Sequence, residues 1–85
     1  MKLWGKIRKD NHTLADAVTV IHAKHAYEVE DWGEPFSELC RKLNLSRPVI
    51  LKKHQRDLEQ FSHAVFRPAD FLEPVEFDRF EVEIF

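Results

Sequence analysis

Residues 2–22, KLWGKIRKDNHTLADAVTVIH, decide the fold. In the first third, apolar residues alternate with polar ones, which is the period of a strand with one face in water. The Asp-Asn pair that follows tolerates the left-handed backbone of a tight turn, and the β-branched residues after it favour another strand. We therefore predict a β-hairpin of residues 2–9 and 14–22. Gly5 inside a strand indicates a bulge or a close backbone approach.

Two amphipathic helices are predicted after the hairpin. The first has one apolar stripe at a period of 3.6 residues, formed by Trp32, Phe36, Leu39, Cys40 and Leu43. Cations near its end suit the helix dipole, so we predict a helix over residues 33–44. The segment LKKHQRDLEQF predicts a second, shorter helix over residues 51–61, with His54 on its apolar face.

The C-terminal third predicts more β-structure. HAVF is a candidate short strand at residues 63–66, and RPADFLEP is an irregular connection with a proline near each end. FDRFEVEIF alternates like a half-buried strand, in which we interpret Glu81 and Glu83 as guards of a sheet edge. The element order predicts one α+β domain over residues 1–85, an antiparallel sheet with two helices packed on one face. The other face would carry Trp4, the basic residues of the first strand and the acidic ones of the last.

Composition indicates a folded intracellular protein. Of the 85 residues, 44% are apolar, which is typical of a chain that folds. A lone cysteine excludes an internal disulfide, and the N-terminus lacks the apolar core of a signal peptide. The longest apolar stretch, AVTVI, is far below the ~20 residues that cross a bilayer. We therefore expect a soluble, cytoplasmic protein with no membrane partner.

The net charge of −2 is divided unevenly along the chain. Residues 1–56 contain eleven Lys/Arg and seven Asp/Glu, whereas residues 57–85 contain two and eight. Such asymmetry indicates a basic surface for an anionic partner or self-association of opposite faces, unless folding interleaves the two halves.

A nucleic-acid surface is one alternative function. Its candidate residues are Lys6, Arg8 and Lys52, with Trp4 available for stacking. The negative balance of the whole chain is unlike that of most nucleic-acid-binding domains, and solvated strand and helix faces explain the same residues. A nucleic acid is therefore not the favoured partner.

Histidines are the candidate metal ligands. His22 and His25 lie three apart, so they point to opposite faces of a strand or to one face of a helix. No zinc signature is matched, and a site would need His54, His63, Cys40 or nearby carboxylates to complete it. We interpret the pair as solvated residues at a strand end, and we predict no metal site and no cofactor.

Sequence motifs of enzymes are missing. There is no Gly-rich phosphate loop, G-x-S-x-G, C-x-x-C or dinucleotide fingerprint. Cys40 lies on an apolar stripe, which favours a buried thiol over a nucleophile paired with His54. No catalytic residue is assigned. The alternative is a small hydrolase-like or metal-dependent enzyme that uses His54 or His63 with nearby carboxylates, because histidine titrates near neutral pH.

The last twenty residues contain five phenylalanines. Most must be core in a chain this short, and any left exposed would form an apolar patch of the kind that binds partners. The leading hypothesis is therefore a non-enzymatic protein–protein interaction domain, acting on an unidentified protein or as a homodimer. It would use a Phe-rich C-terminal surface or an exposed strand edge. The candidate contact residues are Trp4, Phe77, Phe80, Ile84 and Phe85.

Three stretches, KLWGKIRKDN, LKKHQRDLEQF and FRPADFLEPVEFDRFEVE, resemble a group of small uncharacterised bacterial proteins of similar length. The likeness covers nearly the whole chain. It implies a free-standing bacterial domain, and it assigns no catalytic or binding residue.

Overall fold

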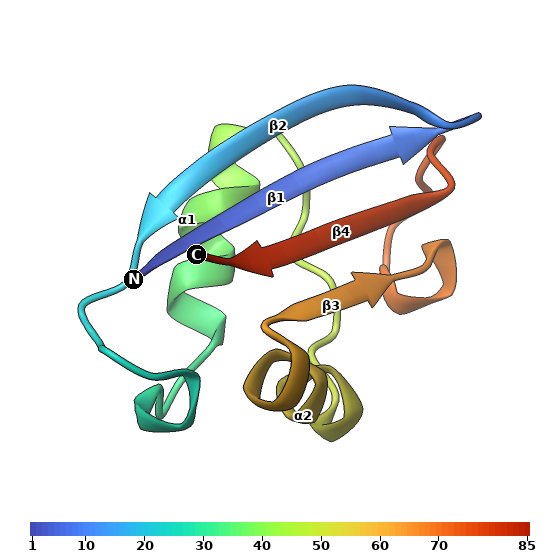
Figure 1. The fold of residues 1–85 in the computed structure, drawn as a ribbon. Helices are drawn as coiled ribbons and strands as arrows, with labels where there is room; N and C mark the ends of the chain where they lie inside the picture. Colours follow the sequence, from blue (N-terminus) through green and yellow to red (C-terminus); the bar gives the residue numbers. More distant parts are fainter.

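The computed structural model describes residues 1–85 and has an α+β fold, as predicted (Figure 1). In chain order the elements are β1 (Lys2–Lys9), β2 (His12–Val20), the 3₁₀ turn η1 (Ala26–Glu28), α1 (Gly33–Lys42), α2 (Lys52–Phe61), β3 (His63–Phe66), the 3₁₀ turn η2 (Pro68–Asp70) and β4 (Arg79–Ile84). The strands form one antiparallel sheet in the order β2-β1-β4-β3. The first and last strands are therefore neighbours, and folding interleaves the basic and acidic halves of the chain. No helix has both the length and the apolar character needed to cross a bilayer.

The hairpin turn is shorter than predicted. Asp10 and Asn11 both have left-handed backbone, with φ of 51° and 64°, which is the two-residue turn that suits the twist of paired strands. β2 consequently begins two residues before the predicted start and ends at Val20. The register passes from Ile7↔Ala15 to Arg8↔Thr13, so Leu14 is an extra, bulged residue.

Gly5 marks a close approach rather than the bulge. A Cβ atom at this position would lie 2.7 Å from Leu39 Cδ2 and 2.9 Å from Phe80 Cε1. Both distances are shorter than van der Waals contact, and both neighbours are fully buried. The missing side chain therefore allows α1 to pack directly on β1 and lets the Phe80 ring lie across the strand.

α1 ends two residues before its predicted end. Asn44 adopts a left-handed φ of 53°. The Leu45 N–H donates to the Cys40 carbonyl at 2.9 Å, and the Asn44 N–H donates to the Arg41 carbonyl at 3.2 Å. This pair of bonds is the Schellman motif, which satisfies the last carbonyls of a helix and turns the chain away.

Both helices lie on one side of the sheet, α1 against β1 and β2 and α2 against β3 (Figure 1). The core between the layers consists of Leu3, Ile7, Ile21, Trp32, Phe36, Leu39, Cys40, Leu58, Ala64, Phe66, Phe71, Phe77, Phe80 and Val82. β2 and β3 are the edge strands, whereas β4 is internal. The interpretation of Glu81 and Glu83 as edge guards is therefore wrong, because β4 pairs with a strand on each side.

Candidate interaction surface

The face of the sheet opposite the helices is uncovered, and we call it the open face. Side chains on it alternate with core side chains along each strand, as the pleat requires. Starting at the chain termini, its cross-strand rows are Val20–Lys2–Phe85, Val18–Trp4–Glu83–His63, Asp16–Lys6–Glu81–Val65 and Thr13–Arg8–Arg79. Trp4 and the predicted basic and acidic strand residues thus share this face.

An apolar patch lies at the end of the open face where the two termini meet. It consists of Trp4, Val18, Val20 and Phe85. The Trp4 and Phe85 rings meet edge to face with centroids 6.2 Å apart. Val20 and Phe85 are each 58% exposed, and Val18 is 38% exposed. Exposed apolar side chains that adjoin in this way are typical of a contact surface.

Polar neighbours hold the Trp4 side chain in place. Its indole Nε1 donates to Asp16 Oδ2 at 2.9 Å. The Lys6 ammonium lies over the indole ring, 4.1 Å from its centroid, in a cation–π contact. Because the side chain is already ordered, a partner that packs on it loses little rotamer entropy.

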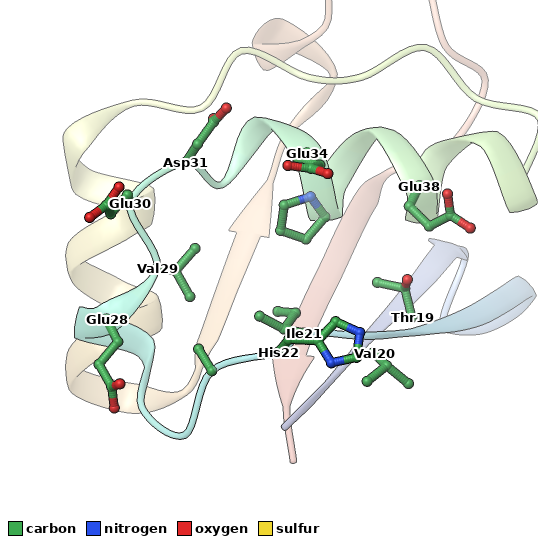
Figure 2. Close-up of a pocket in the computed structure, with 12 residues that line it drawn as sticks. Thr19, Val20, Ile21, His22, Glu28, Val29, Glu30, Asp31, Glu34 and Glu38 are labelled. Carbon is green, nitrogen blue, oxygen red and sulfur yellow. The ribbon is translucent and has the colours of Figure 1, made fainter.

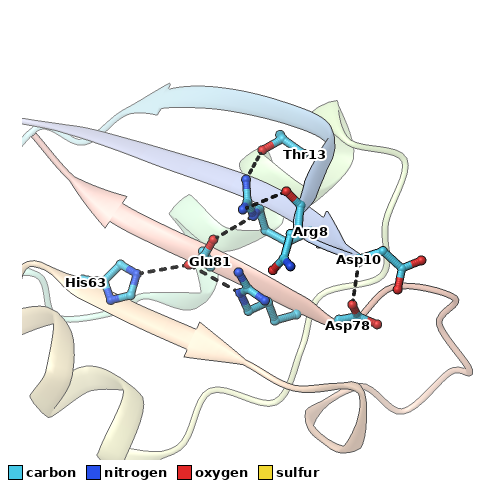
Figure 3. Close-up of polar contacts among 8 residues, drawn as sticks. Arg8, Asp10, Thr13, His63, Asp78 and Glu81 are labelled. Carbon is cyan, nitrogen blue, oxygen red and sulfur yellow. Dashed lines mark hydrogen bonds and ion pairs between the residues drawn. The ribbon is translucent and has the colours of Figure 1, made fainter.

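Charges on the open face are sorted by strand. β1 contributes Lys2, Lys6 and Arg8, whereas the middle of β4 contributes Glu81 and Glu83. Arg8, Arg79 and the His63 ring all lie within 4.0 Å of the Glu81 carboxylate (Figure 3). The surface is therefore a basic stripe beside an acidic one, not the uniform basic patch that nucleic-acid binding favours.

The structure divides the predicted contact residues between surface and core. Phe77 is 9% exposed and Phe80 is fully buried, so the prediction of both as surface contacts is wrong. Both rings pack edge to face against Phe71 within the core, with centroid distances of 5.3 Å for Phe77 and 6.3 Å for Phe80. Ile84 is half-buried and packs against the core. Trp4 and Phe85 remain on the open face.

The predicted nucleic-acid residues do not form one surface. Lys6 and Arg8 lie on the open face, but Lys52 opens α2 in the helical layer. Lys6 also lies between Asp16 and Glu81 in its row. Its charge is thus partly balanced by acids of the same chain.

His54 is buried between α2 and β3. Its Nδ1 accepts the backbone N–H of Leu51 at 3.0 Å, which caps the first turn of α2. Its ring stacks on Phe66 with centroids 4.1 Å apart, and Nε2 lies 3.6 Å from Asp70 Oδ2. Burial lowers the pKa of His54, although the Asp70 carboxylate opposes the shift. Both nitrogens face groups of the protein, so the ring is a structural element.

The remaining histidines are dispersed. His63 lies on the open face, with Nε2 4.0 Å from Glu81 Oε1, and the sheet separates it from His54. His22 and His25 are exposed in the connection after β2, where the His25 ring stacks on Tyr27 at 5.1 Å. No group of three His, Cys, Asp or Glu side chains is arranged to hold a metal ion.

Cys40 is a core thiol. It is 1% exposed, and burial raises the pKa of the Cys40 thiol to about 11 against the opposing effect of the Arg47 guanidinium. A thiol with so high a pKa is protonated at neutral pH, and a protonated thiol is a poor nucleophile.

An open groove of about 570 Å³ lies between the end of β2, η1 and the start of α1 (Figure 2). Glu28 and Glu30 lie on one side, and Glu34 and Glu38 lie along α1 on the other. A hydrogen bond from Arg41 lowers the pKa of the exposed Glu38 carboxyl. Beyond this acidic lining, the groove contains no set of side chains positioned for catalysis.

Several residues of the open face were not singled out from the sequence. The sequence pattern identified only strand residues at Asp16, Val18 and Val20. It identified Arg79 only as one of the polar residues in the alternating C-terminal strand. Strand alternation places each of them on one face, but the pairing of β1 with β4 decides which ones adjoin. Nothing local in the sequence specifies that pairing.

Models of known protein families, curated proteins and solved structures were compared with the chain, and none matches. The resemblance of three stretches to small bacterial proteins stays a prediction.

Proposed function

We propose that this chain is a non-enzymatic interaction module that associates with a second copy of itself through the open face. The observation that supports it best is the arrangement of that face. An exposed apolar patch lies beside a basic stripe on β1 and an acidic stripe on the neighbouring β4. A face with both charges side by side is complementary to itself.

The symmetry of such a dimer follows from the order of the strands. A two-fold axis parallel to the strands, between β1 and β4, places β1 of each copy over β4 of the other. Lys6 then faces Glu81 and Glu83 of the second copy. Trp4 lies on one side of this axis and Phe85 on the other. The Trp4 and Phe85 rings of one copy therefore pack on the Trp4 and Phe85 rings of the second copy. Such an isologous contact is the commonest form of homodimer.

The open face is large enough for a reversible contact. The four strands have nine, eight, six and four residues, and at about 3.3 Å per residue and 4.8 Å between strands they cover roughly 430 Å² in projection. This area is below the roughly 800 Å² per partner of standard interfaces and is typical of weak, transient contacts. Two sheets that pack face to face bury their facing side chains in a layer about 10 Å thick.

The free edge of β2 is a less favourable contact. The Lys42 ammonium donates to the Val18 carbonyl at 2.7 Å, and this carbonyl points away from β1. The bulge at Leu14 interrupts the same strand. Lysines and bulges are the devices that protect sheet edges from pairing with another chain. The open face has no comparable protection.

A mixing experiment tests the proposal. Lys6→Glu places an acid opposite the acidic stripe of the second copy, and Glu83→Lys places a cation opposite the basic stripe. Each variant alone is expected to associate at least tenfold more weakly than the parent. An equimolar mixture of the two is expected to form a heterodimer that is tighter than either homodimer, because position 6 of one variant then faces the opposite charge at position 83 of the other.

Sedimentation velocity with one variant fluorescently labelled measures these affinities. Charge pairs within one copy are present in both monomer and dimer, so they cancel in the association constant to first order. Lys53→Glu changes an exposed lysine on α2 and should associate like the parent. A mixture no tighter than the separate variants would contradict the proposed face-to-face contact.

A further inference from the structure

Three arginines lie side by side at the end of the open face away from the apolar patch. Arg8 on β1 pairs directly with Arg79 on β4. Phe66 pairs with Phe80, and the backbone at Arg67 stays extended, with φ of −96° and ψ of 165°. Arg67 therefore continues the alternation of β3 and lies on the open face beside Arg79. We call these three residues the arginine row.

The arginine row has one nearby counter-ion on this face. Glu81 Oε2 lies 3.4 Å from Arg8 Nε, and Glu81 Oε1 lies 3.6 Å from Arg79 Nε and 4.0 Å from His63 Nε2 (Figure 3). Three arginines against one glutamate leave an excess of two positive charges. The positive charge of the row is therefore incompletely neutralised. Like charges opposite each other on paired strands are destabilising, so a bound anion would relieve this repulsion.

Hydrogen bonding within the row is also incomplete. Arg8 is held by bonds from Nη1 to Thr13 Oγ1 at 2.6 Å and from Nη2 to the Asn11 carbonyl at 3.4 Å. Its Nε is buried and has no hydrogen-bond partner. Arg79 Nε is beyond hydrogen-bond distance of Glu81. The Arg8 guanidinium is thus fixed in place, while the Arg79 guanidinium, which is partly exposed, keeps N–H donors available to another acceptor.

We propose that the arginine row is a binding site for a phosphoryl group, either free inorganic phosphate or a phosphate monoester. Guanidinium groups on strands about 4.8 Å apart can donate to different oxygens of one tetrahedral anion. A phosphoryl group carries about two negative charges at neutral pH, which matches the excess charge of the row. The Arg8 and Arg79 side chains are 25% and 27% exposed, so the anion reaches them from solvent while screening is reduced.

The site belongs to one copy of the chain and does not rest on the proposed dimer. The test therefore uses the parent and Phe85→Glu, a variant whose self-association the proposed function expects to be weak. Because the proposed dimer covers the open face, the row is accessible in Phe85→Glu, which should bind phosphate at least as tightly as the parent. The two proposals are separated if Phe85→Glu binds no phosphate while the parent dimerises, or if Phe85→Glu binds phosphate while the parent stays monomeric.

Titration with inorganic phosphate at constant ionic strength, followed by ¹H–¹⁵N correlation spectra, is the experiment. The arginine Nε–H signals of Arg8 and Arg79 are expected to shift and saturate. Arg79→Gln should weaken phosphate binding at least tenfold. Where Arg79→Gln impairs folding, Arg67→Gln is the second test, because it changes an exposed arginine of the row just after the end of β3 and should also weaken binding. Glu81→Gln should tighten binding several-fold, because it removes the carboxylate that competes for the same donors.

Two further probes assign the ligand class. Phenyl phosphate that binds more tightly than phosphate assigns the site to a monoester, and the opposite order assigns it to the free ion. Acetate at equal ionic strength should bind much more weakly. Arg56→Gln removes an exposed arginine on α2 and should leave the titration unchanged. Non-saturating shifts, acetate that binds as tightly as phosphate, or an Arg79→Gln variant with parental affinity would overturn the proposal.

Discussion

The Trp4 indole and the Phe85 ring meet edge to face at 6.2 Å, although one residue comes from the first strand and the other follows the last. The contact forms because β1 and β4 pair at the centre of the sheet. It leaves Phe85 more than half exposed on a face that no helix covers. The same pairing sorts the charges of the open face into a basic and an acidic stripe, so one topological feature creates both parts of the proposed contact.

Phe85→Glu should weaken self-association at least tenfold. Burying a phenylalanine contributes about 1.5–3 kcal/mol, and each dimer buries the ring twice. The unfolding midpoint should change little, because the ring is exposed in the monomer. Analytical ultracentrifugation over a concentration series measures the effect.

Leu72→Glu is the matched control for this variant. Leu72 is 88% exposed but lies in the connection before β4, near Val49 and Gln55 on the helical side. We expect parental association. Equal weakening in both variants would show that the effect is general surface charge and not contact at the open face.

Gly5→Ala should destabilise the fold by about 1–3 kcal/mol, the usual cost of overpacking a core. The new methyl group meets Leu39 and Phe80, neither of which has free space. Urea denaturation measures the loss. Gly33→Ala is the comparison, because its Cβ would meet only the ends of two exposed side chains that can move, Arg47 Nη1 at 2.7 Å and Asp31 Oδ1 at 2.9 Å, and alanine favours the helix. A Gly5→Ala variant as stable as Gly33→Ala would contradict the close approach.

His54 should make the fold sensitive to mild acid. Burial lowers the pKa of His54 in the folded state, so the unfolded chain takes up the proton first. Stability is then constant above about pH 6.5 and falls as the pH drops below it, by up to about 1.4 kcal/mol per pH unit, until the folded pKa is passed. Urea midpoints between pH 8 and pH 5 measure this dependence.

His54→Gln should remove that component of the pH dependence. A glutamine at this helical position can still accept the Leu51 N–H, as in a capping box, so the start of α2 is retained. His63→Gln, which changes the histidine on the open face, should keep the acid sensitivity of the parent. The assignment fails if the His54→Gln and parent curves are parallel.

The Cys40 thiol should not react with Ellman's reagent at pH 8 in the native protein. It is buried, and its pKa of about 11 leaves little thiolate. Full reaction is expected in denaturant, which confirms that the thiol is free. Rapid modification under native conditions would show that α1 opens from the sheet.

The fold follows from sequence patterns to a large extent, because each element has its own local signal. Alternation specified β1 and β4, and the apolar stripes specified both helices. The ends of elements were less accessible: the start of β2 depends on left-handed backbone at Asp10 and Asn11, and the end of α1 depends on the same conformation at Asn44. The sequence does not reveal such conformations directly, since asparagine and aspartate adopt them only in part of their occurrences.

The site was predicted less completely, because it depends on contacts between distant strands. Phe77 and Phe80 were predicted to lie on the surface because the C-terminal segment is rich in phenylalanine. Both rings are instead buried, and they complete the small core. Composition cannot decide which phenylalanine of a tail stays outside. The arginine row has no local signal at all, since Arg8, Arg67 and Arg79 come together only through pairing of three strands.

Sedimentation equilibrium of the unmodified chain tests the central claim most directly. Measured from about 1 to 500 µM at physiological salt, the data should fit a reversible monomer–dimer equilibrium whose affinity falls as salt is raised, because the facing stripes are charged. A chain that remains monomeric across this range would contradict the claim that the open face binds a second copy.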